Sequence, residues 1–96
     1  MNKNNRNRIG IIINHLINDN NFTKDEVAKH NNENDCWIII DNNVLDVTTF
    51  LDDHPGGKGA ILMYAGKDAT EDFDMLHNRK VIDRYVPNAK IGTISN

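Results

Sequence analysis

The run Asp53-His54-Pro55-Gly56-Gly57 constrains the fold of this chain more than any other feature. Pro55 disfavours helical dihedral angles at His54 and so holds it at a helix end. Gly56 and Gly57 permit positive φ angles and carry no side chain that would block a close approach. The chain is therefore expected to end one helix, turn sharply and begin another, with an imidazole pointing out of the corner. A plain helix-to-helix turn, whose histidine caps a helix, is the other interpretation.

The residues after Val47 predict a series of short helices. The expected ranges are 48–53, 58–65, 68–76 and 78–85, with stops at Gly66 and Pro87. The residues before Val47 predict a hairpin, with strands at 36–40 and 44–47 and a turn at 41–43. A strand at 90–94 closes the domain, so the fold class is α+β, with the helices inserted before the last strand.

The chain of 96 residues is long enough for one domain. The domain is expected at residues 21–96, and Thr23 with Glu26 forms a capping box that opens a helix through about residue 29. Residues 30–35 are expected to form a polar loop. Residues 1–20 are expected to be a flexible, asparagine-rich segment. Apolar residues at helical spacing there predict a short helix over 9–17, which either packs on the domain or docks a partner; a strand is not ruled out.

Composition excludes several classes of function. The net charge of −3 disfavours nucleic acid as a partner. The single cysteine, Cys36, excludes an internal disulfide, a multi-cysteine metal site and covalent haem attachment, and is expected to be a small buried hydrophobe. No apolar stretch approaches the ~20 residues of a transmembrane helix, so we expect a soluble chain.

His77 is the second candidate ligand, 23 residues after His54 and at another expected helix junction. A neutral imidazole nitrogen is a good iron ligand, and two histidines on opposing helical pairs can hold one iron from opposite faces. Each needs an acceptor for its outer N–H. We expect His15 and His30 to be plain surface residues. Twelve apolar residues are spaced to face inward, as a porphyrin pocket or as ordinary core: Ile38, Ile40, Val47, Phe50, Ala60, Ile61, Tyr64, Phe73, Leu76, Val81, Ile82 and Tyr85.

Many segments, in order, resemble cytochrome b5 domains. They are residues 22–31, 36–40, 44–51 leading into His54-Pro55-Gly56-Gly57, 65–73, His77 and 90–92. The ligand spacing is one residue shorter than in the microsomal proteins and looks more like the cytochrome domain of lactate-oxidising flavocytochromes. Lys58 stands where acidic residues are common in the family.

The resemblance implies a cytochrome b5-like fold, a small mixed sheet with two pairs of short helices enclosing one non-covalent haem b. It assigns the iron ligands to His54 and His77, and it implies that Trp37 packs away from the haem. The resemblance also assigns pocket-lining roles to Ile40, Val47, Phe50, Ile61 and Phe73. Pro55, Gly56 and Leu76 complete the expected contacts. Candidate partners of the propionates are Asn78, Arg79, Lys80 and Tyr85.

Two axial histidines leave the iron no open position for a substrate, which points to electron transfer and not catalysis. Expected partners are a flavin reductase and an electron-acceptor protein. The chain itself is expected to be a monomer. The expected compartment is the cytoplasm, with a mitochondrial or membrane-associated location left open. Acidic residues expected at the docking face, or simply on solvated helix faces, are Asp52, Asp53, Glu71, Asp72 and Asp74. The alternatives are a relay domain of a larger flavin-, desaturase- or hydroxylase-type enzyme, and a binding module without electron transfer.

Overall fold

A five-stranded mixed sheet forms the centre of the computed structural model, which describes residues 20–95. The strands are β1 (Asn21–Phe22), β2 (Asn31–Asn32), β3 (Asp35–Ile40), β4 (Asn43–Asp46) and β5 (Lys90–Ile94), in the spatial order β1-β5-β4-β3-β2. The β1–β5 pair is parallel and the others are antiparallel. The hairpin and the closing strand are confirmed. The two-residue strands β1 and β2 were not predicted, because they are too short to show alternation. The helix expected over residues 9–17 lies outside the described residues.

Within residues 20–95, five short helices lie against the sheet: α2 (Lys24–Ala28), the 3-10 helix η1 (Thr48–Asp53), α3 (Lys58–Leu62), α4 (Thr70–Leu76) and α5 (Lys80–Tyr85). The capping box at Thr23 and Glu26 is confirmed, with hydrogen bonds in both directions. Three helices are shorter than expected at their ends. The clearest case is α4, because Ile39 of β3 pairs with the segment before it: the Ile39 N–H donates to Lys67 O at 3.0 Å, and the Ala69 N–H to Ile39 O at 2.8 Å.

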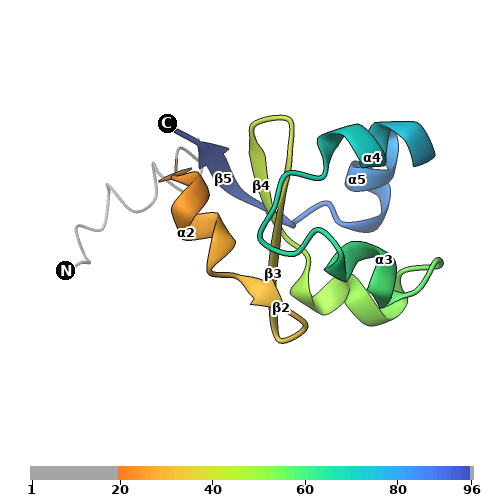
Figure 1. Ribbon diagram of the computed structural model, residues 1–96. Coiled ribbons are helices and arrows are strands. Elements are labelled where there is room, and N and C mark those ends of the chain that lie inside the picture. Colours follow the sequence, from red (N-terminus) through yellow and green to blue (C-terminus); the bar gives the residue numbers. More distant parts are fainter. Residues whose placement is uncertain (1–19, 96) are drawn as a thin grey trace, which may run out of the picture.

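The sheet separates two apolar clusters, as Figure 1 shows by the placement of α2 on one side and α3, α4 and α5 on the other. Alternation along β3 assigns its side chains to the two faces. Cys36, Ile38 and Ile40 belong to the cluster on the side of α3–α5. Trp37 and Ile39 belong to the cluster beneath α2, together with Val27 and Val44. The expected placement of Trp37 away from the helical pairs is therefore confirmed, and so is the full burial of Cys36.

His30 is more than a plain surface residue, which corrects the sequence-based expectation. Its ring stacks on Trp37 with centroids 3.5 Å apart and planes 6° apart. Its Nδ1 lies 2.8 Å from a carboxylate oxygen of Asp35. The contact arises because the Trp37 N–H donates to His30 O at 3.0 Å, which brings the two side chains together across the β2–β3 turn. Within residues 20–95, no helix has both the length and the apolar character needed to cross a bilayer.

Candidate functional site

The main cavity lies between two helical pairs and the sheet. One pair is η1 with α3, which contact each other, and the other is α4 with α5. The cavity has a volume of about 490 Å³, within the ~300–1,000 Å³ usual for cofactor and ligand sites. Its floor comes from β3 and β4 through Ile38, Ile40 and Leu45. The helical pairs supply the walls, and one candidate ligand lies between the two helices of each pair.

His54 lies between η1 and α3, and its own turn fixes its ring. Its backbone is extended (φ −71°, ψ 121°), as expected before Pro55. The Nδ1 atom lies 2.7 Å from the carbonyl oxygen of Gly57. Since a carbonyl only accepts, Nδ1 carries a proton; in the neutral ring Nε2 is then the nitrogen with the lone pair, the form that binds a metal.

The two glycines of the turn have different roles. Gly57 adopts a φ of 90°, which favours glycine. Gly56 has no positive φ, but a Cβ there would lie 3.2 Å from Cε1 of His54. Only one of the two glycines therefore needs left-handed backbone, and the other leaves room for the imidazole.

His77 lies between α4 and α5 and faces His54 across the cavity. It ends α4 in extended backbone (φ −137°, ψ 151°), and its N–H donates to Phe73 O at 2.8 Å. A phenylalanine lies beside each imidazole: Phe73 is 5.2 Å from His77 and Phe50 is 5.9 Å from His54, between ring centroids. Among the described residues, no hydrogen bond reaches the ring nitrogens of His77, in contrast to His54.

The two imidazole rings are spaced to hold one metal ion. Their centroids are 6.2 Å apart. Imidazole nitrogens bind zinc at about 2.0–2.1 Å, and two bonds of that length on opposite sides of one ion place the ring centres about 6 Å apart. In residues 20–95 no cluster of three or more histidine, cysteine or carboxylate side chains could hold a metal. The chemistry of this donor set therefore fits a metal whose other ligands come from a bound cofactor.

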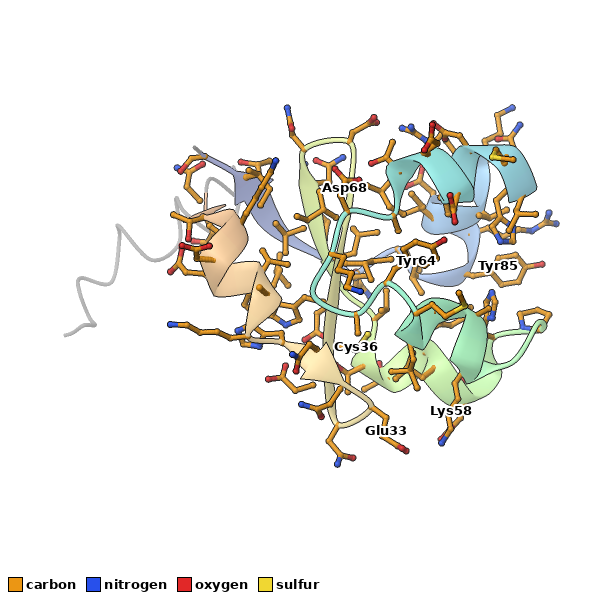
Figure 2. All side chains as sticks on the ribbon, viewed as in Figure 1. Glu33, Cys36, Lys58, Tyr64, Asp68 and Tyr85 are labelled. Atoms are coloured by element: carbon orange, nitrogen blue, oxygen red, sulfur yellow. The ribbon has the colours of Figure 1, made fainter. Side chains whose placement is uncertain are left out.

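Eleven of the twelve candidate ligand and pocket residues line the cavity: His54, His77, Ile40, Val47, Phe50, Pro55, Gly56, Ile61, Phe73, Leu76 and Tyr85. Leu76 and Tyr85 are 77% and 57% exposed, so they belong to its mouth. Figure 2 shows Tyr85 at the open end, between the helical pairs. Asn78 is not part of the lining, and its side chain accepts from the N–H of Lys80 at 2.8 Å.

The lining also includes residues that were not expected there. They are Leu45, Ala69 and Val86. Strand alternation could have identified Leu45 as a lining residue, because Leu45 and its neighbour Val44 in β4 belong to clusters on opposite faces of the sheet. Ala69 could not be found this way, because its place depends on the bond from its N–H to Ile39.

A family model described as the cytochrome b5-like heme/steroid binding domain matches residues 23–95. The chain belongs to this family. The solved cytochrome b5 of Ostreococcus tauri virus 2 has 53% identity and a TM-score of 0.74, covering 77% of this chain and 95% of that one. The expected α+β fold of the cytochrome b5 family is therefore confirmed.

Other relatives are longer than the matched segment. A cytochrome b5 of Borago officinalis is 53% identical over 68 residues, which are 67% of this chain and 52% of that protein. The L-lactate dehydrogenase (cytochrome) of Saccharomyces cerevisiae is 50% identical over 70 residues, 72% of this chain and 12% of that protein. The family domain therefore occurs both in small cytochromes and within a large enzyme.

The acidic residues of the expected docking face differ in their surroundings. Asp74 is bound by the guanidinium of Arg79, and this hydrogen bond holds the pKa of the Asp74 carboxyl below its usual value. Asp52 lies 3.9 Å from Nζ of Lys58, whose main partner is Glu33 at 3.0 Å (Figure 2). The other three, Asp53, Glu71 and Asp72, make no ion pair within residues 20–95, and Asp72 also lines the cavity.

Proposed function

We propose that residues 21–96 bind one haem b, with His54 and His77 as its two axial ligands, and carry single electrons. The observation that carries the proposal is the pair of imidazoles 6.2 Å apart across an apolar cavity. Membership of the cytochrome b5-like family supports it. When bound, the haem supplies an iron that alternates between the ferric and ferrous states.

The residues of the chain have three roles in this proposal. Gly57 O accepts from Nδ1 of His54, which leaves Nε2 of the neutral ring to bind the iron. The apolar floor, with Ile38, Ile40 and Leu45, excludes water from the pocket. The low polarity of this pocket contributes to the reduction potential of the iron. With His54 and His77 both holding the iron, no position would remain for a substrate, so the proposal assigns the domain electron transfer and no catalytic residue.

The proposed partners are a flavin reductase and an electron-acceptor protein that meet the cavity mouth. Asp53, Glu71 and Asp72 make no ion pair in the described chain, so their negative charge is free to act on a partner. Such charge speeds association with a basic partner, and salt screens the effect. The alternative is an electron-relay domain of a larger enzyme, supported by the related segment in the yeast L-lactate dehydrogenase (cytochrome).

One absorption experiment tests the proposed ligands. The chain is reconstituted with haem and reduced with dithionite, and the spectrum is recorded before and after carbon monoxide is added. We expect a low-spin spectrum that carbon monoxide leaves unchanged, because both axial positions are filled. His54→Ala and His77→Ala should each give a high-spin spectrum or lose the haem.

His30→Ala is the matched control, since His30 lies on the other side of the sheet against Trp37. It should keep the low-spin spectrum. Rapid binding of carbon monoxide to the unmodified chain would show an open axial position and contradict the proposal.

A further inference from the structure

Arg79 joins two carboxylates from distant parts of the chain. Its Nε and Nη2 atoms donate to Oδ1 and Oδ2 of Asp74 at 2.6 and 2.8 Å, a two-pronged contact with the last turns of α4. Its Nη1 and Nη2 atoms also donate to Asp41, the latter at 3.1 Å. Asp41 lies in the turn between β3 and β4. We call these three residues the Arg79 clamp.

The clamp also involves the beginning of α4 through Asp41. The N–H of Asp41 donates to Oγ1 of Thr70, the first residue of α4, at 2.7 Å. Thr70 Oγ1 in turn donates to Oδ1 of Asp68 at 2.6 Å. Asp41 therefore holds one end of α4 with its backbone and the other end, through Arg79, with its carboxylate.

His77 lies inside the segment that the clamp spans. Asp74 is three residues before it and Arg79 two residues after it. His54 has a carbonyl partner that fixes its ring, whereas no hydrogen bond from the described residues reaches the ring of His77. The placement of the His77 ring therefore depends on its backbone and on its contact with Phe73. The Arg79 clamp joins Asp74, which precedes His77, to Arg79, which follows it.

We propose that Arg79, bridging Asp41 and Asp74, is a positioning residue that holds His77 at the cavity and slows the release of haem. This inference rests on the proposed haem function. An arginine is suited to the task because its planar, forked guanidinium donates to two carboxylates at once, which a lysine ammonium does not do in the same geometry. The side chains of Arg79, Asp41 and Asp74 are 41%, 53% and 47% exposed, so salt should weaken the clamp.

The test measures the rate of haem transfer to excess apomyoglobin at low and at high salt. Arg79→Met should release haem about two to ten times faster than the unmodified chain at low salt, and the difference should shrink at high salt. Arg79→Lys should lie between the two. Arg84→Met is the matched control: it removes the same charge from α5, and Arg84 has no ion pair within residues 20–95. It should release haem at the unmodified rate.

Asp41→Asn removes the charge that pairs with Arg79 but keeps the backbone shape of the turn. Asp41 has a φ of 58°, a conformation that asparagine also adopts, and the backbone bond to Thr70 is kept. The variant should release haem faster than the unmodified chain. In the Arg79→Met background it should add nothing, because the two residues act through one contact.

A second measurement needs no haem. The N–H of His77 donates to Phe73 O at the end of α4, and its hydrogen exchange should be faster in Arg79→Met but not in Arg84→Met. If the unmodified chain is low-spin but Arg79→Met and Arg84→Met release haem at equal rates, the proposed role of the Arg79 clamp is wrong and the haem function stands. If the unmodified chain gives no low-spin spectrum, the haem function fails instead. Unchanged exchange at His77 would then overturn the clamp as well.

Discussion

At the scale of single residues, neighbouring positions of β3 have opposite surroundings. Cys36 is fully buried in the cluster on the cavity side, and Trp37 packs with Val27 on the other face. Burial raises the pKa of the Cys36 thiol to about 11, with smaller contributions from the charges of Asp46 and Asp35. The thiol therefore stays protonated and unreactive over the neutral pH range, because the thiolate is the nucleophilic form.

The raised pKa of Cys36 predicts a loss of stability in base. In the unfolded chain the thiol ionises near its ordinary pKa of 9.0, whereas in the folded chain it keeps its proton to about 11. The folded state thus binds more protons between these values, so the free energy of unfolding falls as pH rises through that window. Below pH 9 the stability that the protonated Cys36 thiol contributes is fully present.

Urea unfolding of the unmodified chain and of Cys36→Ala measures this effect. The stability difference between them should fall by about 1 kcal/mol per pH unit between pH 9 and 11. Contributions that the two chains share cancel in this difference. Parallel stability curves would contradict the predicted shift.

At the scale of elements, the short strand β1 depends on a close approach to β5. The Thr93 N–H donates to Asn20 O at 2.9 Å, and Phe22 pairs with Ile94. Gly92 permits this contact, because a Cβ there would lie 2.5 Å from Asn20 O and 2.7 Å from Cε2 of Phe22. The approach joins parts of the chain about 70 residues apart.

We therefore expect Gly92→Ala to lower the free energy of unfolding by about 1–3 kcal/mol, the usual cost of overpacking. Denaturant unfolding measures it. Gly59→Ala is the control: a Cβ there meets nothing within 4 Å, and alanine favours the helix α3 over glycine by up to ~1 kcal/mol. Equal effects of the two substitutions would show that the space around Gly92 is unimportant.

At the scale of the whole molecule, the two sides of the sheet differ in how completely they are packed. On the α2 side, Val27 of α2 and Val44 of β4 are fully buried. On the other side, α3, α4 and α5 contain no buried residue, and most of their apolar side chains line the cavity. These helices therefore depend on a bound group for much of their packing.

Removal of haem should consequently affect the two sides unequally. In the haem-free chain we expect backbone amides of α3, α4 and α5 to exchange hydrogen faster than those of β3 and β4. Saturating haem should slow exchange in the helices and raise the stability of the whole domain, by about 4 kcal/mol at a thousand times the dissociation constant. Hydrogen-exchange mass spectrometry with and without haem is the measurement. Uniform exchange in both states would contradict the unequal packing.

Local rules in the sequence were enough for part of this protein. The turn after His54 follows from the steric limits of Pro55 and the freedom of Gly57, and the start of α2 follows from the capping box at Thr23. Ile38 and Ile40, which were expected to face inward, lie two positions apart and share one face of β3. Each of these depends on residues within a few positions of one another, so the sequence displays it.

Other features needed the tertiary structure, because their partners lie far apart in the chain. The start of α4 is set by pairing with Ile39, and the space at Gly92 by Asn20. The sequence makes Arg79 a candidate partner of the haem propionates, but the fold gives it two carboxylates, Asp74 nearby and Asp41 in the hairpin turn. The sequence thus determined the two histidines and their turns. The tertiary structure decided how far apart the histidines are and what holds them, since both depend on how the helical pairs lie against the sheet.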